Sequence, residues 1–568
     1  MTQRIAILPF FVDSEKLQFL SESIQDLLMR ELGISQKYMV ISKQSTAMAH
    51  EQYSDVYEIG NQLDAIRLIE GKIEETENIV VDLAYHRLDK KEKEQITVSV
   101  SKNDIFRLGE TCLEAVLKLL RLKDTSQSPI AVPKLKNPAL YQKFMLGNHH
   151  FNRWNQENVA EAIALFKEVI ESEPNFAPAY LKLAKCYIFQ AGRGLETPNT
   201  AYPLARQAIQ KALDINPNSG EAIIDKNLID FFYDLDWRNI YSSIEIGLEN
   251  YVDASEAYQQ LSFFWYGLKE YDAALDALYS ALEYDPLATG LLNMIGDVQL
   301  SAKRYDDSEK TFQSILKMVP NDPASLENLM YIASLKGNQS IASRYFRKLQ
   351  KALPDPNSYV PRMGYFFGRF GHSREADEYL AYFKQLEKEN PSLVLHNYMA
   401  QVYAGRGDWE KVMDYIEQGW KARTGILFIL TDPQLEPIRK WKRYQVMIGQ
   451  VWLPEKIADV DYVSLHTDIK ETVRVNLKAL LFAKAEDNYT RLYFFQNFRL
   501  EEKLLRATLK TIETQLPENF IRVHRTFIIN GSQPYEVYGN SKTRYITQPQ
   551  HDVEIPVSRS FNVAAIKA

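Results

Sequence analysis

Six prolines recur at nearly regular intervals through the middle of this chain, and no other feature constrains its fold as strongly. The intervals between them are 43, 69, 34, 34 and 37 residues, and 69 is close to twice 34. The prolines are Pro174, Pro217, Pro286, Pro320, Pro354 and Pro391. A fixed period in this range is typical of repeat architectures, whose units pack on their neighbours. The pattern predicts an all-α array over residues 138–452.

Two further positions repeat with these prolines. A small residue stands twelve residues before each of them except the last, where Tyr379 breaks the pattern; the small residues are Ala162, Ala205, Ala274, Ser308 and Ala342. A large apolar residue stands eight residues before each: Phe166, Ile209, Leu278, Phe312, Phe346 and Phe383. A small residue lets two helices approach, the larger one fills the groove, and proline ends the second helix.

This pattern resembles the tetratricopeptide repeat, whose paired helices stack into a solenoid. The resemblance implies a concave surface that binds a protein or peptide, with a simple spacer as the alternative. The long first interval predicts an insertion near residues 192–198. In the unit before Pro286, Tyr251-Val252 replaces the expected proline and Asp236-Trp237 marks the corner between its helices. Residues 428–438 resemble a tail that caps the last repeat in bacterial regulators.

Residues 1–122 predict an α/β domain, followed by a linker over 123–137. Apolar runs predict strands at 5–10 and 38–41, and alternation predicts paired strands at 81–85 and 96–100. Helices are expected over about 20–32, which Gly33 stops, and over 56–63 and 105–120. The order resembles the TolB N-terminal-like domain, through the opening strand and the Leu68–Ile73 segment that turns into the hairpin.

We find no pattern for catalysis, cofactor or metal in the N-terminal domain. It lacks a GxxxxGK[ST] phosphate loop, and Pro9-Phe10-Phe11 stands where a receiver domain has its acidic pair. His50 and His86 are single histidines without metal-ligand spacing. We therefore expect no enzyme here and no phosphorelay control.

Residues 463–568, after a linker over 453–462, predict a mostly β domain. Short β-type runs occupy 473–475, 479–484, 491–495 and 527–530, and one helix is predicted from Leu505, Leu509, Ile512 and Leu516, with Pro517 ending it. Segments 481–489, 520–530 and 555–559 match, in order, the LytTR DNA-binding domain. The resemblance implies that loops enter successive major grooves of double-stranded DNA.

Carried over by motif, the base-reading positions of that family fall on Tyr489, Arg525 and Arg559. Each arginine can contact O6 and N7 of a guanine. Candidate phosphate contacts, which would fix the register on DNA, are Lys484, Asn488, Arg522 and Ser558. Other readings stay open: Tyr489 could face the core and Arg522 could form an internal salt bridge. His524 is expected to be a structural hydrogen bonder and Asn530 to hold a turn before Gly531.

The distribution of charge agrees with DNA binding by one module. Residues 465–568 hold 15 Lys and Arg against 11 Asp and Glu, a surplus of four, so the rest of a chain of net charge −7 carries −11. Two distant cysteines, Cys112 and Cys186, favour a reducing cytoplasm, and no apolar run is long enough for a membrane span.

The sequence leaves three possible functions for this protein to be compared. The leading hypothesis is a bacterial transcriptional regulator that binds DNA as a homodimer or cooperative pair, with the repeats and N-terminal domain sensing a protein, peptide or small ligand. The alternative is an interaction scaffold without DNA binding. An enzyme such as a nucleotide cyclase is disfavoured, because no segment supplies a carboxylate pair or a phosphate loop.

Overall fold

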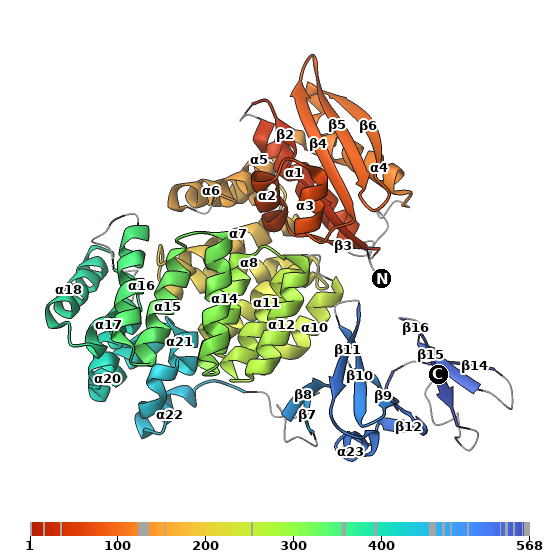
Figure 1. The fold of residues 1–568 in the computed structure, drawn as a ribbon. Helices are drawn as coiled ribbons and strands as arrows, with labels where there is room; N and C mark the ends of the chain where they lie inside the picture. Colours follow the sequence, from red (N-terminus) through yellow and green to blue (C-terminus); the bar gives the residue numbers. More distant parts are fainter. Residues whose placement is uncertain are drawn as a thin grey trace. The chain divides into compact units, whose positions relative to one another are not determined.

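The protein forms two compact units, residues 3–454 and 455–568 (Figure 1). The structure, a computed structural model, describes residues 3–14, 17–34, 37–122, 135, 137–153, 155–250, 254–353, 355, 359–390, 395–453, 462–467, 472–477, 480–496, 499–533, 535–539, 544–548, 551–558 and 561. The three predicted fold types, α/β, helical solenoid and mostly β, are all confirmed, the first two within the larger unit.

The first unit begins with a mixed sheet covered by helices. Its elements are β1 (Gln3–Ile7), β2 (Phe11–Val12), α1 (Gln18–Ile34), β3 (Tyr38–Val40), α2 (Lys43–Gln52), α3 (Val56–Gln62), β4 (Arg67–Glu75), β5 (Asn78–Arg87), β6 (Glu92–Ser101), the 3-10 turn η2 (Lys102–Arg107) and α4 (Leu108–Leu120). The strand order is β3-β1-β4-β5-β6, with β2 beside β4. Helix α2 was not predicted. The Leu68–Ile73 segment does not turn: it is extended within β4 and pairs with β5 throughout.

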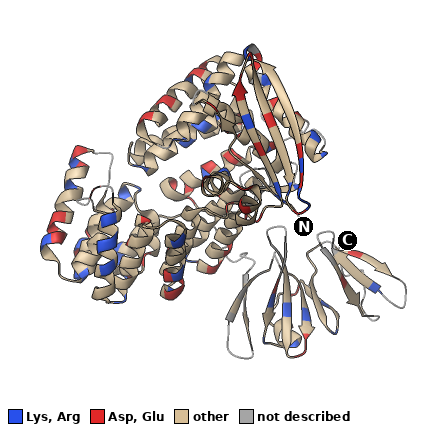
Figure 2. Ribbon diagram, turned by 45° about the horizontal axis from the view of Figure 1, so that its top comes forward, with Lys and Arg blue, Asp and Glu red and all other residues tan. Residues whose placement is uncertain are grey.

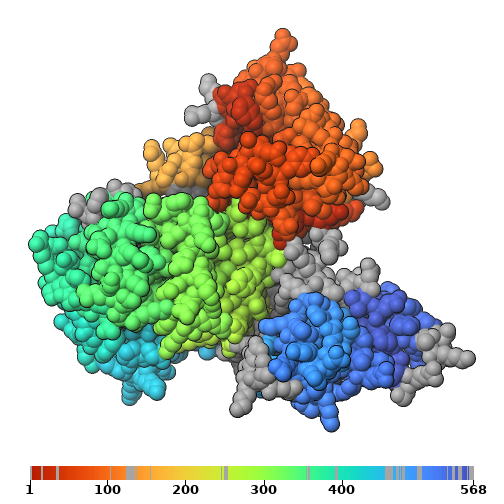
Figure 3. Space-filling model, in the orientation of Figure 1, coloured from red at the N-terminus to blue at the C-terminus, as the bar shows by residue number. Residues whose placement is uncertain are grey.

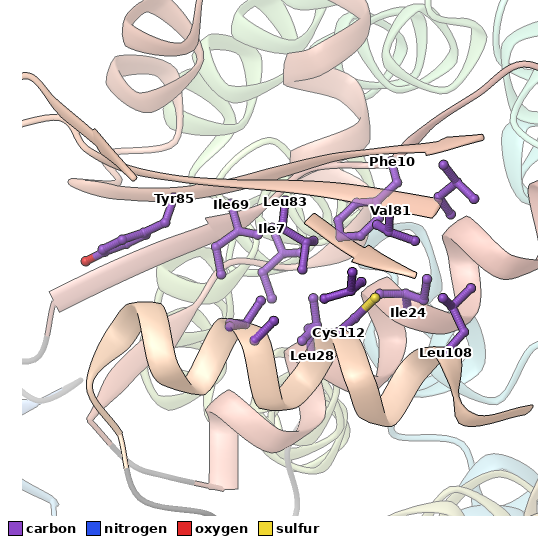
Figure 4. Packing of buried hydrophobic residues seen from close by; sticks show 14 of the residues in the cluster. Ile7, Phe10, Ile24, Leu28, Ile69, Val81, Leu83, Tyr85, Leu108 and Cys112 are labelled. Atoms are coloured by element: carbon purple, nitrogen blue, oxygen red, sulfur yellow. The ribbon is translucent and has the colours of Figure 1, made fainter. Parts of the chain in front are cut away.

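One face of this sheet packs on α1 and α4. Ile7, Ile69 and Leu83 from the strands meet Leu28 and Cys112 from the two helices, and all five are buried (Figure 4). Burial raises the pKa of the Cys112 thiol to about 12, so this sulfur stays protonated and acts as an apolar group.

The helices of the array pack in consecutive antiparallel pairs. They are α5 (Pro138–Phe151), α6 (Gln156–Ser172), α7 (Ala177–Gly192), α8 (Pro198–Ile215), α9 (Gly220–Ile229), α10 (Ile240–Asn250), α11 (Ala254–Gly267), α12 (Tyr271–Tyr284), α13 (Thr289–Ser301), α14 (Tyr305–Met318), α15 (Pro323–Leu335), α16 (Gln339–Ala352), α17 (Met363–Arg369), α18 (Ser373–Glu389), α19 (His396–Arg406) and α20 (Trp409–Lys421). The longer first interval is taken up by the loop between α7 and α8, as the insertion near 192–198 predicts. Pro354, Pro391 and Tyr251-Val252 lie outside the described residues.

The repeated small and large residues sit where the helices of a pair meet. The five small residues of the pattern are fully buried. The Phe166 and Phe312 rings lie directly on Gly147 and Gly296 of the partner helix, so close that a Cβ there would clash. Tyr379, the exception, is equally buried: its ring lies on Gly364 and its hydroxyl donates to the Pro361 carbonyl at 2.7 Å. A hydrogen-bonded tyrosine therefore replaces the small residue in that pair.

The segment after α20 does more than cap the last pair. It contains α21 (Ile426–Thr431), the 3-10 turn η4 (Pro433–Ile438) and α22 (Lys442–Ile448). Asp432, buried at 4% exposure, accepts the hydroxyl hydrogen of Tyr331 from α15, and α21 contacts α11. Trp452 then forms a parallel bridge to Asp236, and its carbonyl accepts the Trp237 N–H at 2.8 Å. The tail therefore returns from the end of the array to its third pair of helices.

The N-terminal domain rests on the array, as the space-filling view shows for the red and orange part (Figure 3). Arg4 forms an ion pair with Glu283 at 2.5 Å, next to the turn between α12 and α13. In that turn Asp285 accepts hydrogen bonds from the Ser42 and Ser45 hydroxyls. Glu22 of α1 lies 3.2 Å from His149 of α5. These contacts join the two folds into one unit.

The second unit is built around a five-stranded sheet of order β11-β10-β9-β13-β12. The strands and helix of the unit are β7 (Tyr462–His466), β8 (Thr472–Asn476), β9 (Leu480–Glu486), β10 (Tyr489–Gln496), β11 (Arg499–Leu505), α23 (Leu509–Glu513), β12 (Phe520–His524), β13 (Phe527–Asn530), β14 (Glu536–Gly539), β15 (Arg544–Gln548) and β16 (His551–Val557). One apolar cluster joins this sheet to the β7–β8 hairpin and α23, and a second joins it to Tyr535, β15 and β16.

The predicted helix of this unit is too long at both ends, because α23 already ends at Glu513, before Leu516 and Pro517. Leu505 belongs to β11, where it pairs with Thr490 of β10. The helix starts only after Thr508, whose hydroxyl caps it by accepting the Thr511 N–H at 3.2 Å. The four-residue spacing of Leu505 and Leu509 thus joins the end of a strand to the start of a helix, because both residues face the same core.

Candidate nucleic-acid interface

The first candidate loop is the tight turn between β9 and β10. Asp487 adopts a left-handed conformation, φ 53°, which aspartate tolerates in such hairpins. Asn488 follows it and is exposed, and Tyr489, which opens β10, is 38% exposed. The next residue, Thr490, is fully buried and its hydroxyl donates to the Ala507 carbonyl at 2.8 Å. The alternation of the strand thus turns Tyr489 toward solvent rather than into the core.

Charged side chains support this turn from the strands. Arg491 of β10 lies 2.9 Å from Glu486 and 2.9 Å from Glu502. Lys484 of β9 lies 3.4 Å from Glu486 as well and keeps 40% of its side chain exposed. The hydrogen bond from Arg491, and after it that from Lys484, lowers the pKa of Glu486 below its ordinary value. The ion pairs hold Arg491 along the strand, whereas the Lys484 side chain remains partly exposed beside Glu486.

The second candidate loop is the turn between β12 and β13, where Arg525 is exposed. His524 Nδ1 lies 2.8 Å from the Thr526 hydroxyl and accepts the Thr526 N–H at 3.3 Å. Burial, followed by the charge of Arg525, lowers the pKa of His524. Its ring therefore acts as a neutral brace of the turn, the structural role expected from the sequence.

Arg522 has an internal partner. Its guanidinium lies 2.5 Å from a Glu513 carboxylate oxygen of α23 and also donates to the Arg525 carbonyl at 2.8 Å. The salt-bridge alternative for Arg522 is therefore the one observed, and its guanidinium fixes the backbone of the turn that carries Arg525. Sequence reasoning did not identify Glu513 as its partner.

The third candidate loop follows β16. The Ser558 N–H donates to the Val523 carbonyl of β12 at 2.8 Å, and the Ser558 carbonyl accepts the Phe561 N–H at 3.0 Å. Arg559 lies outside the described residues. Ser558 thus fixes the start of this loop beside the last residues of β12.

The strand register brings the first two loops and Ser558, the residue before the third, to one end of the sheet. Phe527, the first residue of β13, pairs with Lys484 near the end of β9, and the Ala485 N–H donates to the Thr526 carbonyl at 2.9 Å. The turn with Arg525 therefore lies beside the strand that leads into the turn with Asn488 and Tyr489. Ser558 lies at the same end of the sheet, because its N–H bonds to the Val523 carbonyl near the end of β12. Blue positions mark lysine and arginine along these strands in Figure 2.

Asn530 marks the opposite end and is held more extensively than predicted. Its buried amide donates to the Leu477 and Leu480 carbonyls at 2.9 and 3.0 Å, and its oxygen accepts the Ser532 N–H at 3.1 Å. It therefore holds the turn before Gly531 and also ties β13 to the entry of β9. Within the described residues no group of three His, Cys, Asp or Glu is arranged to hold a metal, and no helix is long and apolar enough to cross a bilayer.

Known proteins resemble the two units separately. Residues 470–567 match the model of the LytTr DNA-binding domain, and residues 266–330 match that of a tetratricopeptide repeat. The transcriptional regulator HilA of Salmonella typhimurium is 23% identical over 373 residues, which cover 62% of this chain and 63% of HilA. The chain thus spans less than two thirds of the length of that relative.

Two further resemblances are more local. An uncharacterized response regulatory protein of Vibrio cholerae is 32% identical over 91 residues, 15% of this chain and 33% of that protein. The crystal structure of PilW, a type IV pilus biogenesis factor, covers 40% of this chain and 97% of its own, at 18% identity and a TM-score of 0.33. The two family models alone identify residues 470–567 as a LytTR-type DNA-binding domain and residues 266–330 of the helical array as tetratricopeptide repeat.

Proposed function

We propose that this protein is a sequence-specific DNA-binding transcriptional regulator. The observation that carries the proposal is that two turns of the LytTR-type domain and Ser558, the described residue that follows β16, lie at one end of its sheet, with Arg525 exposed at a braced turn. The relative HilA bears the name of a transcriptional regulator, which agrees with this role. Arg525 and Arg559 would read guanines, and Tyr489 would contact a base through its hydroxyl or ring.

The phosphate contacts would come from side chains around these loops. Lys484, Asn488 and Ser558 lie at the same end of the sheet and are the best placed of the predicted set. Arg522 would act indirectly, because Glu513 and the Arg525 carbonyl already occupy its guanidinium. Binding as a homodimer or cooperative pair is part of the proposal, since domains of this type bind paired sites.

The unit formed by residues 3–454 would receive the signal, in the form of a protein, a peptide or a small ligand. The tail from Ile426 to Trp452 is the physical link through which such a signal would reach the second unit. It contacts α11, α15 and the Asp236-Trp237 corner before the chain continues. A ligand that moves any of these helices would alter the point at which the chain leaves the array.

The decisive experiment is selection of bound duplexes from a random DNA pool with the full chain, followed by footprinting at several salt concentrations. We expect one enriched motif and an affinity that falls steeply with salt, by about 10³–10⁵ between 50 and 200 mM if 6–10 phosphates are contacted. Arg525→Ala and Arg559→Ala should each relax the base preference at one position. Lys503→Ala, exposed in the middle of the edge strand β11, should leave the motif unchanged.

A pool without any enriched sequence at low salt would contradict the proposal and favour an interaction scaffold. Enrichment of the same motif by both arginine variants would leave DNA binding in place but show that these side chains do not read the bases.

A further inference from the structure

The edge strand β11 ends beside the first candidate loop (Figure 1). Its register pairs Leu505, the last residue of the strand, with Thr490 of β10. Because the two strands are antiparallel, the residue that follows β11 lies at the same end of the sheet as Tyr489. That residue is Arg506, which was not among the candidate positions predicted from the sequence.

A tight turn presents Arg506 to solvent. The Ala507 N–H donates to the Leu505 carbonyl at 2.9 Å, which closes a three-residue turn with Arg506 at its centre. Both neighbours are buried, Leu505 at 2% and Ala507 at 0% exposure, and both belong to the apolar core of this unit, whereas Arg506 is exposed. The core therefore fixes the backbone on each side of the arginine and leaves its side chain outside.

Two further contacts hold this turn in place. The Thr490 hydroxyl of β10 donates to the Ala507 carbonyl at 2.8 Å, and the next residue, Thr508, caps α23. The turn is thus anchored to the sheet on one side and to the helix on the other. An arginine on a fixed backbone loses little conformational entropy when it binds, because only its own side chain has to be ordered.

The charge of Arg506 has no carboxylate partner among the described residues. The neighbouring β9–β10 turn holds two carboxylates, Glu486 and Asp487, which by themselves would repel a phosphate. Arg491 lies 2.9 Å from both Glu486 and Glu502, so its charge is already paired. A phosphate that approaches this side of the sheet therefore needs a further cation, and Arg506 supplies it.

The strand order places Arg506 at one margin of the candidate interface. In the order β11-β10-β9-β13-β12, Arg506 follows the first strand and Arg525 lies in the turn between the last two. Five neighbouring strands span about 19 Å, at roughly 4.8 Å for each gap. Each DNA strand carries one phosphate per ~3.4 Å of helix axis, so a row of this width passes several phosphates. Arg506 extends the row by one strand beyond Tyr489, away from Arg525.

We propose that Arg506 binds a phosphate of the DNA backbone beside the base that Tyr489 contacts. This inference rests on the proposed function, because it adds a contact to the same interface. The guanidinium donates to the phosphate oxygens, a pairing to which its planar fork of N–H groups is suited. A phosphate carries no sequence information, so the contact adds affinity and fixes the register without selecting a base.

The test is titration of labelled duplexes with the full chain and with Arg506→Ala, between about 50 and 200 mM salt. One duplex carries the selected motif and the other a scrambled sequence. Arg506→Ala should weaken binding of both duplexes by the same factor and reduce the slope of log affinity against log salt by about one unit. Over this range the advantage of the parent over the variant should then shrink by about 3.5-fold, the change for one phosphate.

Lys503→Ala is the matched control, because it removes the same charge from the same strand. Lys503 is exposed and pairs with Leu492, about 10 Å before Arg506 along β11. That distance is about one Debye length at physiological salt, so the slope should stay that of the parent. Arg506→Lys keeps the positive charge and should restore most of the slope. Urea denaturation should give the parent's stability for all three variants, since neither side chain has a carboxylate partner in the described fold.

Three results would overturn the contact: an unchanged salt slope in Arg506→Ala, an equal reduction in Lys503→Ala, or a changed preference at a single base pair. A loss of affinity without a change of slope falls under the first and would assign Arg506 a structural role. If the parent shows no salt-dependent binding to any duplex, the proposed function fails and this contact fails with it. If the parent selects a motif but Arg506→Ala keeps the full slope, the proposed function stands and only the contact is wrong.

Discussion

Arginine is used in opposite ways in the array and in the DNA-binding domain. Arg362, before α17, lies 3.1 Å from Asp297 and 4.7 Å from the centre of the Tyr331 ring, and 19% of its side chain is exposed. Burial opposes its charge, but Asp297 and then Asp432 outweigh this and raise the pKa of Arg362. Arg525 is exposed at the end of a turn, and its guanidinium has no ion-pair partner among the described residues.

The difference separates charged side chains that stabilise the fold through internal partners from charged side chains that remain available to bind DNA. In the array the tail supplies Asp432 to the group around Arg362, so the guanidinium is used to hold distant helices together. At the candidate interface the surrounding groups, His524 and Arg522, support the backbone and leave Arg525 unpaired. A positive charge whose neighbours brace it without neutralising it is the better candidate for contact with DNA.

The largest expected effect is that of Arg362→Ala on stability. Removing the half-buried Arg362 leaves the half-buried Asp297 carboxylate and the buried Asp432 carboxylate without this positive charge, so the free energy of unfolding of the 3–454 unit should fall by about 2–3 kcal/mol. Urea denaturation of the full chain measures this. Arg374→Ala is the control, because its side chain is 86% exposed and should contribute less than about 1 kcal/mol. Equal losses of unfolding free energy in Arg362→Ala and Arg374→Ala would contradict the stabilising role given to Arg362.

Arg525→Ala should weaken DNA recognition and leave the stability of the protein unchanged, the opposite of Arg362→Ala. We expect a loss of about 1–3 kcal/mol in discrimination at one base pair, because a fork of two hydrogen bonds to guanine disappears. The melting temperature should stay unchanged, since the side chain has no ion pair in the described fold. Competition binding with single-base variants of the selected site measures the first quantity and calorimetry the second. A lowered melting temperature would show that the Arg525 side chain stabilises the fold.

A pH titration extends the comparison to the N-terminal domain. The His86 hydrogen bond, against burial and assisted by Lys93, lowers the pKa of Glu70 from 4.5 to about 2. A depressed folded pKa stabilises the protein above pH 4.5, and this contribution is lost as the pH falls toward 2. With 35% of the side chain exposed, it should amount to about 1 kcal/mol after screening. Glu70→Gln should flatten this part of the stability profile, and an unchanged profile would contradict it.

The smallest effect distinguishes two neighbours on β10. Tyr489→Phe should cost about 0.5–1.5 kcal/mol of DNA affinity, the contribution of one hydrogen bond, without loss of stability. Thr490→Val should leave base preference intact but destabilise the domain, because its buried hydroxyl bonds to Ala507. Band-shift titrations and urea denaturation of the pair measure both quantities. If the two profiles were exchanged, Tyr489 would be part of the core.

The sequence predicted the helices and strands that follow a repeating or alternating pattern. It missed the side-chain contacts whose partners lie far apart in the chain. The proline period located the helix pairs because each pair packs locally, and the 527–530 run located β13. No local pattern indicates that Asp432 meets Tyr331, about a hundred residues earlier, or that Arg522 selects Glu513. The Leu505–Leu509 spacing was misread because a strand end and a helix start can place two leucines on one core. Candidate positions at the loops came from motifs, whereas their common location came from the strand register.

The return of the tail changes how the array should unfold. Stacked repeats ordinarily behave as a one-dimensional chain in which each end can fray independently. Here the Asp236–Trp452 bridge joins the third pair of helices to the end of the array, and Arg423 donates to the Tyr233 carbonyl at 2.7 Å, which links the same two parts of the chain. The last pairs cannot detach without breaking contacts in the middle. We therefore expect the part of the array from its third pair to the tail to unfold together rather than to fray from its C-terminal end.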